Sequence, residues 1–263
     1  MIDLYTFDNY PELQKPKRQM KYTLIWCAKG SATLVVDDKE LLLTNSQLVT
    51  ITSGQIHYFK KISKADGTIL EFTLDFICKD DNDIELIFHN GLFCHFDLNE
   101  VITVSDRQII EGPLKLIGEE LLNKPYQYLI SIRCGIELML VAINRIKVNR
   151  GDEIYKPDAL FLKFLELVRS NFSSNFPLSH FAKQLRTTEA KLNEQSKLHT
   201  GKTAQNVMYG LVISEAKRLL TYKDLTVKEV AYELGFNDPF YFSNFFKKHT
   251  QISPKDYKIR YAL

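Results

Sequence analysis

Two short segments in the carboxy-terminal half of this 263-residue chain share one apolar pattern, and this repeat constrains the fold more than any other feature. Each segment places three large apolar residues and one alanine at positions i, i+3, i+4 and i+7. The residues are Leu178, Phe181, Ala182 and Leu185 in the first copy, and Val227, Val230, Ala231 and Leu234 in the second. This spacing is typical of a short amphipathic helix whose alanine lets a partner helix approach closely. Because the copies are 49 residues apart, they indicate a duplicated unit.

The second copy is followed by a turn and a second predicted helix. Gly235 can adopt the positive φ of a tight turn, and Pro239 suits the first turn of the helix that follows. That helix, predicted over Phe240–His249, buries phenylalanines on one side and leaves polar and basic positions on the other. The preceding helix opens with Thr226 and Glu229, a capping box. Together these features predict a helix-turn-helix, whose second helix fits the major groove of DNA.

Between the two copies, Thr203–Thr221 is predicted to form a long helix that holds the duplicated units at a fixed separation. The charge is also unevenly distributed. Residues 157–263 contain 16 Lys and Arg against 10 Asp and Glu, whereas residues 1–156 contain 18 against 22. The net charge of +2 therefore hides a carboxy-terminal half at +6 and an amino-terminal half at −4. A basic half indicates that this end of the chain meets a polyanion.

A family resemblance rests on short motifs that follow the second copy. They are Leu-Gly-Phe at 234–236, Tyr241-Phe242, Phe246-Lys247-Lys248, Ser253-Pro254 and Tyr257. Over about 100 carboxy-terminal residues the chain resembles the AraC/XylS-type transcription regulators. The resemblance implies seven helices that form two helix-turn-helix units on one linker helix, after a cupin-like sensor barrel and a helical dimerisation segment. It also implies a sequence-specific transcription regulator that binds double-stranded DNA, contacts RNA polymerase, responds to a small-molecule effector and forms a homodimer.

The resemblance assigns roles residue by residue. It implies recognition helices at Thr188–Leu198 and Asp238–His249, which would enter successive major grooves about 34 Å apart. The residues implied to read bases are Ala190, Asn193 and Glu194 in the first helix, and Pro239, Phe240, Ser243 and Asn244 in the second. Asn suits adenine, and Glu can accept a hydrogen bond from cytosine. The residues implied to contact phosphates are Thr187, Thr188, Lys191, Lys197, Lys202, Thr203, Lys247 and Lys248.

The chain departs from the family pattern in three ways. Arg186 stands where the first turn normally has Gly, so either a non-glycine residue takes a positive φ or the turn differs. Gln251 replaces a Gly at a helix end. Pro239 and Phe240 replace polar readers, so the second unit either contacts thymine methyls or supports the backbone, and the first unit does most of the base reading.

The amino-terminal half reads as strands followed by helices. Short β-rich runs separated by turn residues cover Tyr22–Ala28, Ser31–Val36, Glu40–Thr44, Gln47–Thr52, Ile56–Lys60 and Thr68–Ile77, which predicts a small antiparallel barrel or sandwich. Helices are predicted at Asp106–Leu122 and Tyr126–Lys147. In the second, apolar residues recur at helical spacing and could either form a dimer or cover the barrel of their own chain. The candidate effector contacts are Trp26, His57 and Phe59.

The predicted fold class is α+β with two domains: an antiparallel cupin-like β-barrel followed by helices, then an all-α domain with two helix-turn-helix units joined by a linker helix. The predicted boundaries are 1–105 for the effector-binding barrel, 106–148 for the dimerisation segment, 149–157 for the linker and 158–263 for the DNA-binding domain. No long apolar run or secretory leader is present at the amino terminus. We therefore expect a cytoplasmic protein without a membrane segment.

The alternative is a cupin-type metalloenzyme fused to a DNA-binding tail. The barrel segment supplies one histidine, His57, and one imidazole cannot hold a catalytic metal unaided. The other cluster of soft ligands is His89, Cys94 and His95, whose adjacent Cys94 and His95 would point to opposite faces of a strand. A third class, an alkyl-transfer DNA repair protein, needs a metal-activated cysteine cluster that scattered cysteines do not provide. We therefore expect no enzyme activity, no cofactor and no metal site.

Overall fold

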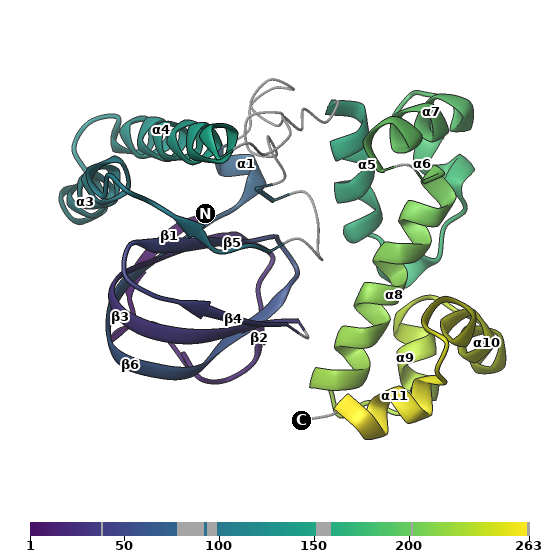
Figure 1. Cartoon of the computed structure of the whole chain (residues 1–263). Helices are drawn as coiled ribbons and strands as arrows, with labels where there is room; N and C mark the ends of the chain where they lie inside the picture. Colours follow the sequence, from purple (N-terminus) through teal and green to yellow (C-terminus); the bar gives the residue numbers. More distant parts are fainter. Residues whose placement is uncertain (38, 78–91, 94–98, 151–158, 201, 262–263) are drawn as a thin grey trace. The chain divides into compact units, whose positions relative to one another are not determined.

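The computed structural model describes residues 1–37, 39–77, 92–93, 99–150, 159–200 and 202–261. The chain divides into two compact units, Met1–Lys156 and Pro157–Leu263, called unit 1 and unit 2 below. Unit 1 contains the sheet and a helical hairpin, and the described part of unit 2 is helical (Figure 1). The predicted fold class, α+β in two domains, is confirmed. In the described residues, no helix is long and apolar enough to cross a membrane.

Unit 1 is built on one antiparallel sheet. Its strands are β1 (Ile2–Thr6), β2 (Lys17–Arg18), β3 (Tyr22–Val36), β4 (Lys39–Leu43), β5 (Gln47–Ile51), β6 (Ile56–Phe72) and β7 (Ile102–Thr103). The main order is β1-β6-β3-β5-β7, with β2 paired to β6 and β4 paired to β3. The sheet curls around a cluster of buried side chains that includes Ile25, Cys27, Leu34, Phe59 and Ile69, and we call this side its inner face.

Two predicted turns are wrong, because long strands run through them. Lys29-Gly30 interrupts the register of β3 without ending it: Lys29 pairs with Asp66, Ser31 pairs with Ser63, and Gly30 has φ 77°. Residues 65–67, the turn expected directly before the predicted strand Thr68–Ile77, likewise lie inside β6. Pairing between β3 and β6 supplies the ladder bonds that these turn-prone residues need to stay extended. The last predicted strand also ends early, at Phe72, and Leu74–Ile77 forms the short helix α1.

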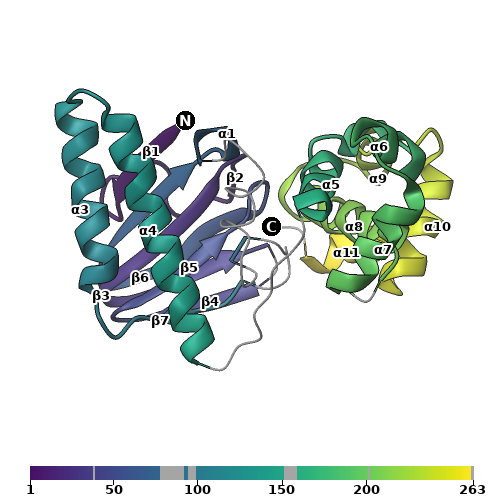
Figure 2. The ribbon, with the colours of Figure 1, turned by 90° about the horizontal axis from the view of Figure 1, so that it is seen from above.

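Two helices of unit 1 form a hairpin over the sheet (Figure 2). These are α3 (Gln108–Asn123) and α4 (Tyr128–Asn149), close to the predicted bounds. Four residues of the predicted apolar stripe of α4 are buried at 0–1% exposure, namely Ile132, Ile136, Leu140 and Ile143, and the fifth, Leu129, is half-buried. The sequence left open whether this stripe forms a dimer or covers the barrel of its own chain. The structure shows that it covers the core of its own unit. The outer face of α4 instead exposes Ile130, Cys134 and Leu138.

In the described part of unit 2 there are seven α-helices, the number that the resemblance implies. They are α5 (Ala159–Arg169), α6 (Leu178–Gln184), α7 (Glu189–Thr200), α8 (Ala204–Tyr222), α9 (Val227–Glu233), α10 (Pro239–Thr250) and α11 (Pro254–Tyr261), with a short 3₁₀ turn, η2, at Phe172–Ser174. The long helix α8 carries a buried core shared with α9 and α10, which includes Ala216, Leu220, Val230, Phe242 and Phe246. Thr203 caps α8 with its side chain.

Candidate DNA-binding surface

The two copies of the apolar pattern fold into the same turn. In the second copy, the amide of Gly235 donates to the carbonyl of Tyr232 and that of Phe236 donates to Ala231, both at 2.9 Å. In the first copy, the amide of Arg186 donates to Lys183 at 3.1 Å, and that of Thr187 donates to Ala182 at 2.9 Å. Each of these residues lies 49 positions from its counterpart. The duplication predicted from side chains is thus repeated in the backbone bonds of the turn.

The position between the helices has a positive φ in both copies. Gly235 has φ 72°, and Arg186 has φ 51°. Of the two alternatives that the sequence left open at Arg186, the structure therefore has the strained one: a non-glycine residue in the left-handed region. Gln251, the other departure, ends α10 in the same region with φ 66°, and its amide donates to the carbonyl of Lys247. At both positions a non-glycine residue therefore adopts the left-handed conformation.

The second helix-turn-helix is fixed at both of its helix starts. Thr226 accepts from the amide of Glu229, and the Glu229 carboxylate accepts from the amide of Thr226 at 2.7 Å, which is the predicted capping box. At the start of α10, Asp238 accepts from the amide of Phe240 at 2.8 Å, and Pro239 occupies the first turn. A side-chain cap at each start stabilises the short helices that present the outer surface.

On α7, the predicted contact residues are mostly exposed and one is not. Ala190, Lys191, Glu194 and Lys197 are exposed, and the ammonium of Lys191 pairs with the carboxylate of Glu194 at 3.0 Å. Asn193 is half-buried. Its Oδ1 accepts from the buried amide of Ala204, the first residue of α8, at 3.0 Å. A bidentate hydrogen bond to adenine would need that oxygen. In this structure the Asn193 side chain instead makes a hydrogen bond that joins α7 to α8.

On α10, the side chains of Phe240, Asn244, Lys247 and Lys248 are exposed, and that of Phe240 is 73% exposed. Pro239 and Ser243 are half-buried, and the hydroxyl of Ser243 donates to the carbonyl of Pro239 at 2.8 Å. The remaining predicted phosphate contacts divide by exposure: Thr188 and Lys202 are exposed, while Thr187 and Thr203 are half-buried. Tyr241 is 62% exposed on the same helix. The sequence did not predict a contact role for it, because Tyr241 entered only as one residue of the family motif.

The three candidate effector contacts of unit 1 do not lie together. His57 and Phe59 belong to the inner face of the sheet. Trp26 alternates with Ile25 and Cys27 along β3, so it lies on the opposite face, where its Nε1 donates to the carboxylate of Glu111 on α3 at 3.2 Å. The structure does not bring the three together, because the bulge at residues 29–30 reverses the alternation of β3. Before the bulge Ile25 and Cys27 face inward, and after it Leu34 and Val36, which pair with Phe59 and His57, face inward.

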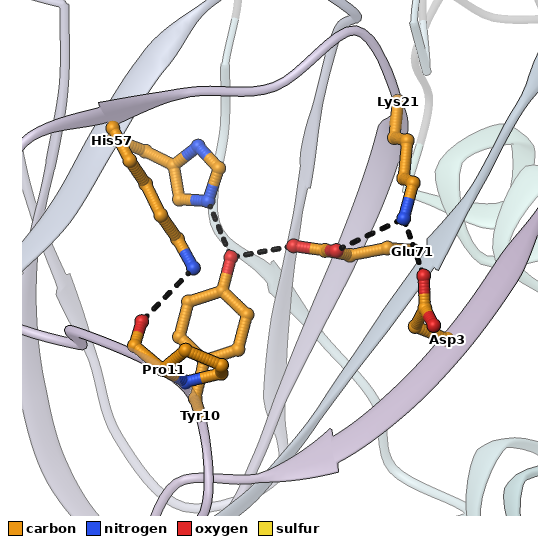
Figure 3. Close-up of polar contacts among 7 residues, drawn as sticks. Asp3, Tyr10, Pro11, Lys21, His57 and Glu71 are labelled. Atoms are coloured by element: carbon orange, nitrogen blue, oxygen red, sulfur yellow. Dashed lines mark hydrogen bonds and ion pairs between the residues drawn. The ribbon is translucent and has the colours of Figure 1, made fainter.

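His57 instead belongs to a buried polar cluster (Figure 3). The hydroxyl of Tyr10 donates to the carboxylate of Glu71 at 2.5 Å, and Nε2 of His57 lies 3.1 Å from the same hydroxyl oxygen. Because the single hydroxyl proton is directed to Glu71, Nε2 of His57 is the donor in its own contact. Lys21 pairs with Asp3 and lies 3.9 Å from Glu71. The sequence did not predict this cluster, because Tyr10, His57 and Glu71 are far apart along the chain.

Burial dominates the titration of this cluster. It lowers the pKa of His57 to about 4, with a further decrease from the charge of Lys17. Burial and the hydrogen bond to Glu71 raise the pKa of Tyr10 above its ordinary value. Burial lowers the pKa of Lys17 to about 8, and its ammonium lies 3.2 Å from the centroid of the Tyr10 ring. At neutral pH the imidazole of His57 and the phenol of Tyr10 are therefore both neutral.

No set of three potential metal-ligating side chains comes together among the residues that the structure describes. His89, Cys94 and His95 lie outside those residues. His57 is the histidine of the barrel segment, and its Nε2 is already engaged with Tyr10.

The fold and the duplicated turns define a helix-turn-helix DNA-binding domain in unit 2. Residues 181–260 match the family model of a helix-turn-helix domain. The resemblance to the AraC/XylS-type transcription regulators is confirmed for this part of the chain by the comparisons with known proteins.

Two relatives and one solved structure illustrate the likeness. An uncharacterised helix-turn-helix transcriptional regulator of Pseudoalteromonas carrageenovora is 28% identical over 127 residues, which cover 48% of this chain and 75% of the relative. The transcriptional activator RhaS of Salmonella paratyphi B is 30% identical over 118 residues, covering 45% of this chain and 42% of RhaS. ToxT of Vibrio cholerae, solved with an unsaturated fatty acid bound, aligns with 98% of this chain and 94% of its own, at 18% identity and a TM-score of 0.42.

Proposed function

We propose that this chain is a sequence-specific DNA-binding transcription regulator that places α7 and α10 in successive major grooves. The observation that carries the proposal is the duplicated turn, in which two helix pairs have the same backbone bonds at a constant offset on one linker helix. The two second helices carry the exposed lysines Lys191, Lys197, Lys247 and Lys248. Positive charge on both recognition helices suits a polyanion contacted at two places.

The exposure of the side chains supports a division of labour within the surface. We assign base reading to Ala190 and Glu194 of α7 and to Phe240 and Asn244 of α10, because these are exposed at the predicted positions. Pro239 and Ser243 are less accessible and are assigned to the same face of α10 as supporting contacts. Asn193 becomes a positioning residue that joins α7 to α8. Phe240 suits the methyl group of thymine.

Phosphate contacts are assigned to the lysines and to the threonines at helix starts. Thr188 accepts from the amide of Lys191, and Thr203 accepts from the amide of Asn206, so each hydroxyl keeps its proton for an external acceptor. A phosphate beside these residues would also meet the positive end of α7 or α8. Thr187, Lys197 and Lys202 complete the first set, and Lys247 and Lys248 serve the second recognition helix.

Unit 1 is proposed to control this activity through an effector or through dimer formation. The buried Tyr10, His57 and Glu71 cluster places polar groups in an otherwise apolar interior, where an effector would find hydrogen-bond partners. A homodimer would use the exposed face of α4 with Ile130, Cys134 and Leu138, since the predicted stripe is buried. RNA polymerase is the proposed protein partner, and the proposed location is the cytoplasm. The metalloenzyme alternative is not favoured, since one engaged histidine is a poor metal ligand set.

The proposal is tested by selecting DNA fragments with the purified full-length protein and measuring affinity for the selected site. We expect Asn244→Ala to change the preferred base at one position of the site. Lys247→Ala should instead weaken binding to all sequences and reduce the slope of log affinity against log salt by about one. Enrichment of no sequence would overturn the proposal, and equal losses on every site for both variants would overturn the assigned reading positions.

A further inference from the structure

Unit 2 contains a cavity of about 270 Å³ between its two helix-turn-helix motifs. Its floor is α8, which contributes Met208 and Val212. One wall is the segment that joins α5 to α6, with Phe172 and Phe176. The opposite wall belongs to the second motif and includes Phe236 of the turn. Phe181 of α6 also lines it, so the cavity borders both motifs and the helix that links them, which are labelled in Figure 1.

The recognition helix α10 forms part of the second wall. Tyr241 and Phe245, one helical turn apart, line the cavity, while Phe240 and Asn244 on the neighbouring face are the exposed residues assigned to DNA. The rings of this wall are in contact: the centroids of Phe236 and Phe245 are 5.4 Å apart, and those of Phe236 and Tyr241 are 6.1 Å apart. Tyr241 is 62% exposed, which leaves much of its ring free to meet a ligand.

The lining defines the chemistry of a ligand. Aromatic rings dominate it, and none of the described residues that line it carries a charged side chain. The side-chain amides of Asn175 and Gln205 also line the cavity and have no hydrogen-bond partner within the described part of the chain. A wholly apolar protein cavity of about 150 Å³ accommodates benzene. The larger volume here suits one or two fused rings, stacked on aromatic side chains and anchored by one polar group.

We propose that this cavity is a binding site for a neutral, planar aromatic molecule of one or two rings, and that its occupation alters DNA affinity. A charged ligand is disfavoured because the lining offers no opposite charge to offset its desolvation. This site is separate from the effector site proposed in unit 1. Its existence does not depend on the proposed function, whereas its effect on DNA binding does.

The packing around Gly235 explains why occupation would affect both motifs. A Cβ at Gly235 would lie 2.5 Å from the carbonyl oxygen of Ser173 and 2.8 Å from the amide nitrogen of Asn175. The segment that carries Phe172 and Phe176 is thus in direct contact with the turn of the second motif. A ligand that touches both walls favours one distance between α7 and α10. DNA affinity changes if this distance differs from the distance that the DNA-bound protein adopts.

Methyl NMR of the methionines provides a direct test. The full-length chain has four methionines, and only Met208 lies in unit 2; the others are Met1, Met20 and Met139. With ¹³C-methyl-labelled protein, 2-naphthol should shift the Met208 signal saturably and leave the other three in place. The anionic analogue 2-naphthoate should have no such effect. The signal is assigned by its loss in Met208→Leu.

A filled cavity gives the matched control. Gln205→Trp places an indole in the cavity and should abolish the shift, whereas Asn206→Trp, at the exposed neighbouring position, should retain it. Gln205→Phe is the second filling variant, and an unchanged Met139 signal with unchanged circular dichroism shows that each variant is folded. An absent Met208 shift at the solubility limit of 2-naphthol, or a shift that persists in both filled variants, would overturn the site.

The effect on DNA is measured with the same variants. Saturating 2-naphthol should change the dissociation constant for the selected DNA by about fivefold or more in the parent protein and in Asn206→Trp. It should leave Gln205→Trp unchanged. A Met208 shift with unaltered DNA affinity would overturn the coupling. If the protein selects no DNA at all while Met208 still responds, the proposed function fails and the site stands.

Discussion

Replacing Gly235 with alanine should destabilise unit 2 by about 2–5 kcal/mol. A left-handed backbone costs a non-glycine residue about 1–2 kcal/mol. The added Cβ would also lie 2.5 Å from the carbonyl oxygen of Ser173, a backbone atom that cannot swing aside as a side chain does. Overpacking of this kind typically costs about 1–3 kcal/mol. The two terms together give the expected range.

The equivalent position of the first motif should respond in the opposite direction. Arg186 already occupies the left-handed region with φ 51°, so Arg186→Gly removes the strain. Part of the gain is offset because glycine has more freedom in the unfolded chain, which leaves a net stabilisation of about 0.5–1 kcal/mol. Gly210→Ala is the matched control, since Gly210 lies inside α8 and, apart from the local backbone of that helix, no atom lies within 4 Å of the added Cβ. It should stabilise by about 0.5–1 kcal/mol.

Urea unfolding followed by two probes separates the units. The single tryptophan, Trp26, is 1% exposed in unit 1, so its fluorescence reports on that unit. Far-ultraviolet circular dichroism reports mainly on helices, most of which belong to unit 2. Gly235→Ala should lower the midpoint of the circular dichroism transition and leave the Trp26 transition in place. If Gly235→Ala were as stable as Gly210→Ala, the close approach to Ser173 would not be the constraint we infer.

Two further perturbations test individual contacts. On folding, the pKa of His57 falls from its ordinary 6.5 to about 4, so between these pH values the unfolded chain binds more protons than the folded one. The free energy of unfolding of unit 1 should therefore decrease by on the order of 3 kcal/mol as the pH falls from 6.5 to 4. His57→Gln should flatten that slope of unfolding free energy against pH, and an unchanged slope would count against the buried neutral imidazole. Asn193→Ala should cost unit 2 about 1–2 kcal/mol, because it leaves the buried amide of Ala204 without its acceptor, whereas Asn193→Asp should restore most of the loss in urea unfolding. If Asn193→Ala changed the preferred base without a loss of stability, Asn193 would be a base-reading residue and not a positioning residue.

The carboxy-terminal fold was predictable because its signals are local. A four-position apolar pattern, a capping box at Thr226 and Glu229, and a glycine at 235 are each read within one helical turn of the chain. Their repetition at a fixed offset identifies two equivalent turns, and the backbone bonds of both turns have that same offset. At Arg186 the sequence leaves two alternatives open, and the structure has the one with a positive φ.

The amino-terminal half depended on pairing between distant residues. Lys29-Gly30 and residues 65–67 have the composition of turns, yet they stay extended because β3 and β6 pair across them. The same pairing, with its bulge, decides on which face of the sheet Trp26 lies, and so it separates Trp26 from His57 and Phe59. The cluster of Tyr10, His57 and Glu71 likewise unites residues as many as 61 positions apart.

The sequence by itself determined the class of the carboxy-terminal unit, since helix caps, turn glycines and apolar periodicity act over a few residues. Only the tertiary structure decided which side chains meet. It turned Asn193 toward α8, buried most of the apolar stripe of α4, and formed a cavity between two motifs from aromatic residues that lie far apart along the chain. These outcomes depend on non-local packing, in which the free energy of each contact is set by elements that the local pattern does not contain.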